Sequence, residues 1–177
     1  MKIRKMTKLS GLFVITLIAG FLIFSCRSGS KKAGEKVMEN AIENAIENAT
    51  GEDAKVAIEK EKTVIESGGN RFEVDGNATK WPKEIPDDVP EFKFGKVEAV
   101  TSSVVDGANV WTIAFKEVPD GFLDKYEAQL KDKGFETTII KSGDKGGSIM
   151  AETKKFNVFL MGGEGTVSIS VNVKKPE

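Results

Sequence analysis

Apolar and polar residues alternate along much of the C-terminal half of the chain. In the segment 166–173 the residues Val167, Ile169, Val171 and Val173 share one parity, and serine, threonine and asparagine occupy the other. This period of two predicts a strand with one buried and one wet face. Similar patterns predict strands at 96–105, 109–116, 135–141, 148–153 and 156–161. The segment 156–161 is apolar at both parities, so we expect it to be central or covered on both sides.

The segment between the second and third of these strands has helical spacing instead. Its apolar residues fall three and four apart: Phe122, Leu123, Tyr126 and Leu130. Pro119-Asp120 is expected to start the helix, and Gly134-Phe135 predicts a Schellman ending. We therefore predict an α+β fold for residues 96–175, an antiparallel sheet of order β-β-α-β-β-β-β with one helix packed on its face.

A second helix is predicted at 35–50, where a near-repeat of Glu-Asn-Ala-Ile occurs three times. The expected apolar stripe consists of Val37, Met38, Ala41, Ile42, Ala45, Ile46 and Ala49. A spacer helix that docks this stripe on its own domain is favoured, and a partner-binding or membrane-surface helix is the alternative. Residues 54–76 follow with a strand pattern that predicts a small β-meander.

Residues 77–95 contain three of the five prolines and predict a Pro-rich connector. Because each proline biases the preceding residue toward extended geometry, we expect an extended segment. Four apolar side chains would pack from it onto the α+β domain: Trp81, Ile85, Val89 and Phe92. The alternative is that these four form a binding surface at the lip of a ligand site.

The N-terminus has the pattern of a secretory signal. Four basic residues lie within positions 1–8, an apolar run covers 9–24, and Ser25 precedes the sole cysteine, Cys26. A basic start followed by such a run is typical of signal peptides. Ile23-Phe24-Ser25-Cys26 resembles the lipobox of bacterial lipoproteins, which implies cleavage between Ser25 and Cys26 and lipidation of Cys26. A transmembrane anchor is the alternative, since about 16 apolar residues nearly span a bilayer.

This interpretation divides the chain into six parts. They are a signal peptide at 1–25, the lipidated cysteine with a flexible tether at 26–34, an amphipathic helix at 35–50, a meander at 54–76, a connector at 77–95 and the α+β domain at 96–175. The tether is rich in glycine, serine and lysine and lacks apolar periodicity.

The amino-acid composition excludes several classes of catalytic site, metal site and partner. The chain has no histidine and one cysteine, which excludes histidine-dependent nucleophiles, histidine-ligated zinc and intrachain disulfides. Without residues 1–25 the chain keeps 22 of its 26 basic residues against 27 acidic ones, a charge of −5, so nucleic acid is not an expected partner. We expect no catalytic residue, metal or cofactor.

Three groups of residues are candidate chemical sites. The glycine-rich stretches 143–147 and 162–165 are expected to be hairpin turns, because neither has the strand-to-helix pattern of a phosphate loop. Asp120 and Asp124 are expected to serve helix capping and solvation, and Lys154-Lys155 a turn.

A wider resemblance covers residues 35–173. The motifs Trp81-Pro82-x-x-Ile85-Pro86-x-Asp88-Val89-Pro90, the strand from Trp111 to Phe115 and Tyr126-x-x-x-Leu130-x-x-x-Gly134-Phe135 resemble a group of small bacterial lipoproteins built around a domain of unknown function. The resemblance implies a location in the cell envelope and a noncatalytic role.

The leading hypothesis is a non-enzymatic lipoprotein of the cell membrane or outer membrane, which holds the membrane through Cys26 and presents its domain to a protein or envelope component. The alternative is a protein outside the cytoplasm that binds a small ligand or inhibits an enzyme. A hydrolase that uses carboxylates is the third class.

Overall fold

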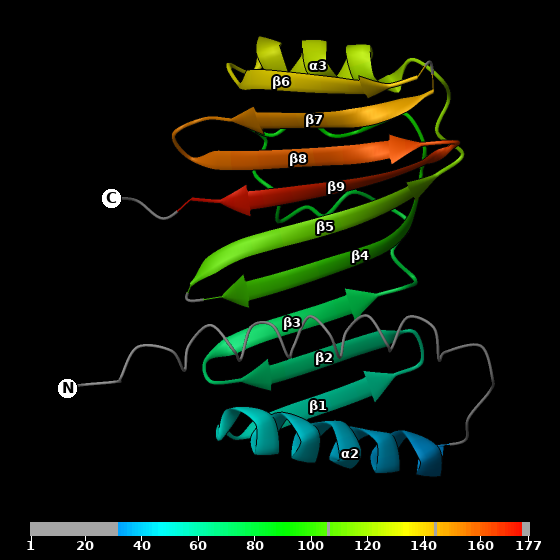
Figure 1. Ribbon diagram of the computed structural model, residues 1–177. Coiled ribbons are helices and arrows are strands. Elements are labelled where there is room, and N and C mark those ends of the chain that lie inside the picture. The colour runs from blue at the N-terminus through cyan, green and yellow to red at the C-terminus, as the bar shows by residue number, and fades with distance from the viewer. Residues whose placement is uncertain (1–31, 106, 144, 175–177) are drawn as a thin grey trace. The chain divides into compact units, whose positions relative to one another are not determined.

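The described part of the chain divides into two compact units, with the boundary between Arg71 and Phe72. A computed structural model describes residues 32–105, 107–143 and 145–174. Over this part the protein has nine strands and two helices (Figure 1). The strands pair antiparallel in β1–β2, β4–β5, β5–β9, β9–β8, β8–β7 and β7–β6. The predicted α+β class is therefore confirmed.

The first unit contains the helix α2 (Lys32–Thr50) and the strands β1 (Ala54–Glu59) and β2 (Lys62–Ser67). β1 and β2 form an antiparallel hairpin in which Val56 is opposite Ile65. The strand β3 (Asn70–Asp75) crosses the boundary between the units. The three predicted strands at 54–76 are present, and the first two belong to this unit.

α2 lies along β1 within this unit (Figure 1). Ile42 and Ile46 are buried, but the alanines of the predicted stripe, Ala41, Ala45 and Ala49, are exposed. Val37 is 70% exposed and Met38 40% exposed. The predicted stripe is thus wrong in most of its members, because the docked face also contains the glutamates of the repeat.

The second unit contains a six-stranded antiparallel arrangement in the order β4-β5-β9-β8-β7-β6 (Figure 1). Its elements are β4 (Lys96–Val105), β5 (Ala108–Lys116), α3 (Phe122–Asp132), β6 (Glu136–Ser142), β7 (Gly146–Glu152), β8 (Phe156–Gly163) and β9 (Thr166–Val173). The order along the chain, β-β-α-β-β-β-β, agrees with the predicted one.

One row of side chains shows how this sheet buries a single face. Ile139 is opposite Ile149, which is opposite Leu160. Leu160 is in turn opposite Ile169, which is opposite Ile113. Because side chains alternate between faces, this apolar row and its neighbours form one continuous buried surface under α3.

α3 covers that surface with the predicted residues, since Phe122, Leu123, Tyr126 and Leu130 are all buried. The predicted start at Asp120 is wrong, because Gly121 at the N-cap adopts a left-handed conformation and no side chain caps the helix. The predicted ending is confirmed: the Phe135 amide donates to the Leu130 carbonyl at 3.0 Å, next to Gly134 with φ 82°.

Candidate functional site

The residues that sequence patterns single out in the connector lie in the core of the second unit. Ile85, Val89 and Phe92 expose 4% or less of their surface, and Trp81 is half-buried against the same cluster. Packing therefore accounts for these side chains, and Ile85, Val89 and Phe92 offer almost no surface to a ligand.

The connector is folded rather than extended. The Ile85 amide donates to the Pro82 carbonyl at 3.3 Å, and the Val89 amide donates to the Pro86 carbonyl at 2.9 Å. These are two successive turns of four residues. Ile85 and Val89 are four residues apart because each is the last residue of one turn. Both side chains therefore point into the core.

Phe92 links the connector to the sheet and to α3. Its ring lies 4.7 Å from that of Phe115 and 5.2 Å from that of Tyr126, measured between centroids. The Tyr126 hydroxyl donates to the Pro90 carbonyl at 2.9 Å. Burial of this hydroxyl raises the pKa of Tyr126 above its usual value. Tyr126 is a structural residue that anchors the connector.

Ser25 and Cys26, the expected cleavage and lipidation residues, lie outside the described residues.

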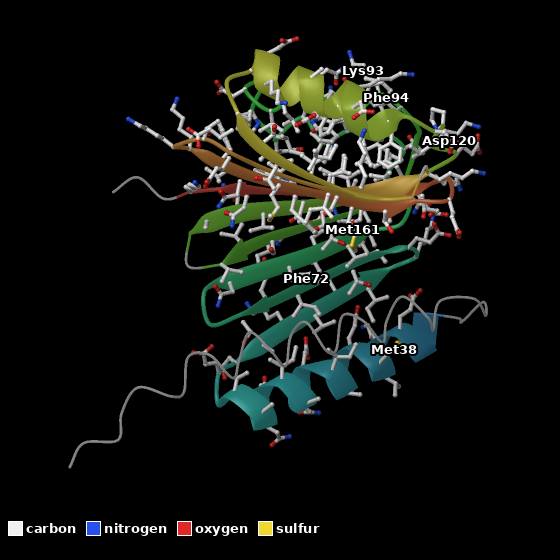
Figure 2. The ribbon with its side chains drawn as sticks, turned by 45° about the horizontal axis from the view of Figure 1, so that its top comes forward. Met38, Phe72, Lys93, Phe94, Asp120 and Met161 are labelled. Carbon is white, nitrogen blue, oxygen red and sulfur yellow. The ribbon has the colours of Figure 1, made fainter. Side chains whose placement is uncertain are left out.

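The opposite face of the sheet carries the exposed apolar side chains of this unit. Four large residues form what we call the apolar patch: Ile140 (58% exposed), Met150 (51%), Phe159 (43%) and Met161 (58%). They come from β6, β7 and β8. Figure 2 shows Met161 on the side of the sheet away from α3.

The strand registers place the four residues in two adjacent rows. In one row Ile140 is opposite Ser148, and Ser148 is opposite Met161. In the next row Met150 is opposite Phe159. Residues two apart on one strand lie on the same face, so the rows join into one surface. The patch is continued by hydroxyl side chains: Thr138, Ser148, Ser168 and Ser170.

The apolar patch bears on the prediction that the segment 156–161 is central or covered on both sides, of which the first alternative holds. The segment 156–161 is central, because β8 pairs with both β7 and β9. In the described part of the chain it is covered on one side only, because Phe156, Val158 and Leu160 are buried whereas Phe159 and Met161 are exposed. The signal for the patch was present in the sequence, since apolar residues at both parities on a one-sided sheet must expose one set.

Two carboxylates of α3, those of Asp124 and Glu127, have local partners. The Asp124 carboxylate contacts the Lys141 ammonium at 2.8 Å. Hydrogen bonds from Lys131 and from the Thr137 hydroxyl lower the pKa of Glu127. Asp120 is exposed. Asp124 is therefore engaged in an ion pair with Lys141, and Asp120 is solvated.

The glycine-rich stretches 143–147 and 162–165 were predicted to be hairpin turns, and this holds in part, because Gly146 and Gly147 belong to β7 and Gly162 and Gly163 belong to β8. Residues 143–145 connect β6 to β7, and Glu164-Gly165 connects β8 to β9. The two turns line an open hollow of about 510 Å³. A Cβ at Gly147 would lie 2.2 Å from the Ile140 carbonyl oxygen, and one at Gly162 would lie 2.4 Å from the Thr166 carbonyl oxygen. Close backbone approach therefore explains both glycines.

A second open hollow, of about 570 Å³, lies beside the turn at Lys154-Lys155. Its lining carries both charges, Lys133, Lys154, Lys155 and Lys174 against Asp88, Glu136 and Glu152. Lys174 contacts Glu152 at 3.1 Å, and the Lys133 ammonium donates to the Asp87 carbonyl at 3.0 Å. The mixed charges of its lining do not favour anionic over cationic ligands in this hollow.

Within residues 32–105, 107–143 and 145–174, no three acidic, cysteine or histidine side chains gather as metal ligands. Neither helix of this part has the length and apolar content needed to cross a bilayer. Comparison with protein-family models, curated proteins and solved structures finds no match to the chain.

Proposed function

We propose that the protein is a non-enzymatic lipoprotein of the bacterial cell envelope that binds another protein through the apolar patch. The attachment half of this proposal is supported by the basic and apolar residues before Cys26 and by the glycine and serines that follow it; the predicted tether at 26–34 is shorter than expected, because α2 already begins at Lys32. Acylation would give stable anchoring, because two or more acyl chains hold a protein at a bilayer where one is marginal.

The observation that carries the binding half is the exposure of four large apolar residues on one sheet face. Burying each such side chain fully contributes about 1.5–3 kcal/mol, and contiguous exposed apolar surface marks interaction sites. Serine and threonine side chains border the patch, and Glu136 and Glu152 follow in the next row of the same face, so its rim can satisfy hydrogen bonds. A protein with a complementary apolar surface fits it better than a polyanion does.

Methionine supports the same proposal. Met150 and Met161 have flexible, polarizable side chains that adapt to irregular partner surfaces. The residues at the buried face, by contrast, are mostly branched or aromatic. The two faces of one sheet are therefore built for different purposes, stable packing on one side and adaptable contact on the other.

The patch is tested by site-specific photocrosslinking in intact cells. A photoreactive phenylalanine analogue is placed at Met150, Phe159 or Met161, and at Ala128 on the exposed side of α3 as a control. The three patch positions should yield the same protein adduct, which is absent at Ala128. Adding Met150→Ser to the probe at Met161 should reduce the adduct several-fold. No adduct, or the same adduct at Ala128, would contradict a protein partner at this face.

The anchor is tested separately. Cells are labelled with radioactive palmitate, and the wild-type chain is compared with Cys26→Ser. The wild type should be labelled and found in the membrane fraction, and the variant should lose the label. Unchanged labelling of the variant would exclude Cys26 as the acylated residue, whatever the photocrosslinking shows.

A further inference from the structure

The glutamates of the Glu-Asn-Ala-Ile repeat in α2 accept hydrogen bonds from backbone amides of β1. The Glu39 carboxylate accepts from the Ile58 amide at 2.7 Å, and the Glu43 carboxylate accepts from the Val56 amide at 2.8 Å. Glu47 accepts from the Ala54 amide at 3.3 Å. We call these three glutamates the carboxylate row. Every fourth residue of the helix thus contacts every second amide of the strand.

The geometry of the two elements explains this match. Four residues of a helix advance about 6.0 Å, and two residues of a strand advance about 6.7 Å. The difference is small enough for glutamate side chains to absorb over a few repeats. Successive glutamates of the repeat also differ in direction by about 40° around the helix axis. The glutamates therefore point progressively away from β1 along the row. The longest bond and the exposed glutamate are both at Glu47, where α2 nears its end.

The carboxylate row occupies the place of a neighbouring strand. The Ala54, Val56 and Ile58 amides point away from β2, and in a larger sheet they would donate to carbonyls of the next strand. An edge of this kind is a template for pairing with another chain, and proteins cover or charge such edges to prevent it. A carboxylate accepts hydrogen bonds but does not donate, so the row matches only the donor half of the edge.

The sequence of β1, Ala-Lys-Val-Ala-Ile-Glu, is complementary to itself. If two copies pair antiparallel with Ala57 opposite Ala57, then Val56 is opposite Ile58 and Lys55 is opposite Glu59. The two-fold symmetry forms each of these pairs twice. Opposite charges directly across two strands are favourable, as are pairs of β-branched residues.

We propose that the β1 edge is a self-association surface for the β1 edge of a second copy, and that α2 closes this surface with the carboxylate row. Residues 51–53 connect α2 directly to β1, so the row acts at a high effective concentration and competes with a second chain. The closed form is the one described above. Release of α2 opens the edge, independently of any partner at the apolar patch.

The proposal predicts a specific disulfide. In the self-paired register the two Ala57 side chains face each other in a non-hydrogen-bonded pair, with Cβ atoms about 4.5–5.5 Å apart. This is close to the separation that a disulfide needs. The full chain carrying Cys26→Ser and Ala57→Cys has a single cysteine, at the centre of the expected dimer.

The experiment measures the rate of disulfide-linked dimer formation in this single-cysteine chain, in excess non-ionic detergent. Replacing the row by Glu39→Ala, Glu43→Ala and Glu47→Ala should accelerate the dimer about tenfold or more. The matched control is Asn40→Ala, Asn44→Ala and Asn48→Ala on exposed positions of the same helix, and it should leave the rate unchanged.

A variant with a single substitution keeps the test valid if the triple-alanine variant does not fold. Glu43→Ala alone removes the central bond and leaves Ile42 and Ile46 buried, so a rise of about threefold is expected. The register is checked in the triple-alanine background. Lys55→Glu should slow the dimer, and Lys55→Glu together with Glu59→Lys should restore it.

Three results would overturn the proposal. The first is an unchanged rate in both the single and the triple alanine variants of the row. The second is an equal acceleration by the asparagine control. The third is equally fast dimer formation when the cysteine is introduced by Glu61→Cys in the β1–β2 turn, which would indicate collision within a micelle rather than pairing of β1.

Discussion

α3 and α2 are both amphipathic helices that lie against strands, yet they make contact in different ways. α3 places Phe122, Leu123, Tyr126 and Leu130 on the face of a sheet. α2 buries Ile42 and Ile46 and otherwise uses carboxylates to bind the backbone of β1. A sheet face offers side chains to a helix, whereas a strand edge offers amides. The comparison shows that a glutamate repeat on a helix can be a docking face.

The largest expected effect is in α3. Leu130 is fully buried in the core, so Leu130→Ala should destabilise the second unit by about 2–5 kcal/mol through lost burial and a residual cavity. Urea unfolding followed by Trp111 and Trp81 fluorescence measures this loss. Ala128→Ser on the exposed side of the same helix should change it by less than about 0.5 kcal/mol. A small loss for Leu130→Ala would mean that α3 is not a core element.

The corresponding change in α2 should be smaller and local. Ile46 is also fully buried, but a helix along a strand edge can move to fill the space. Ile46→Ala should therefore cost about 2 kcal/mol, at the low end for such a change. Hydrogen exchange should show the loss in α2 and in the outward amides of β1. An equal loss of protection throughout β2 would contradict separable docking of α2.

Single members of the carboxylate row should contribute less again. Glu43→Ala removes the acceptor of the Val56 amide and should cost about 1 kcal/mol, because solvent at this half-buried site weakens a charge-assisted bond. Glu43→Gln keeps a carbonyl acceptor of the same reach and should cost less. Thermal unfolding of the pair measures the difference. Equal losses would indicate that charge, not the hydrogen bond, holds α2.

The last effect, which alone depends on pH, concerns the sole tyrosine. Tyr126→Phe removes the bond to the Pro90 carbonyl and should cost about 0.5–1.5 kcal/mol. Because the folded chain holds the tyrosine proton more tightly than the unfolded chain, this contribution is complete below pH 10 and declines as the pH rises further. Urea unfolding at pH 8 and pH 11 should therefore show a steeper loss in the wild type than in Tyr126→Phe. Parallel losses would contradict the raised pKa.

The second unit was predictable because its signals are local and repeated. Strict alternation at 166–173 and the spacing of Phe122, Tyr126 and Leu130 correspond to the buried faces that the structure shows. The glycine ending of α3 also follows from the backbone freedom of Gly134. Each of these signals depends on residues a few positions apart.

Contacts between backbone and distant side chains were not predictable in the same way. The sequence pattern of 35–50 predicts only an apolar stripe and assigns no contact to the row from Glu39 to Glu47, because hydropathy places glutamate in water whatever its partner. Its partners are amides 7 to 19 residues away, which every sequence contains. The apolar patch was missed for a related reason, since Phe159 and Met161 look buried until β8 is known to be covered on one side.

The central claim, that carboxylates of α2 replace a neighbouring strand, is tested most directly by hydrogen exchange of individual β1 amides. The full chain is compared with the variant Glu39→Ala, Glu43→Ala and Glu47→Ala under conditions in which it stays monomeric. The account predicts an alternating result: the Ala54, Val56 and Ile58 amides lose protection, whereas the Ala57 and Glu59 amides, which face β2, keep theirs. Unchanged protection of the outward amides, or equal loss along the whole strand, would contradict it.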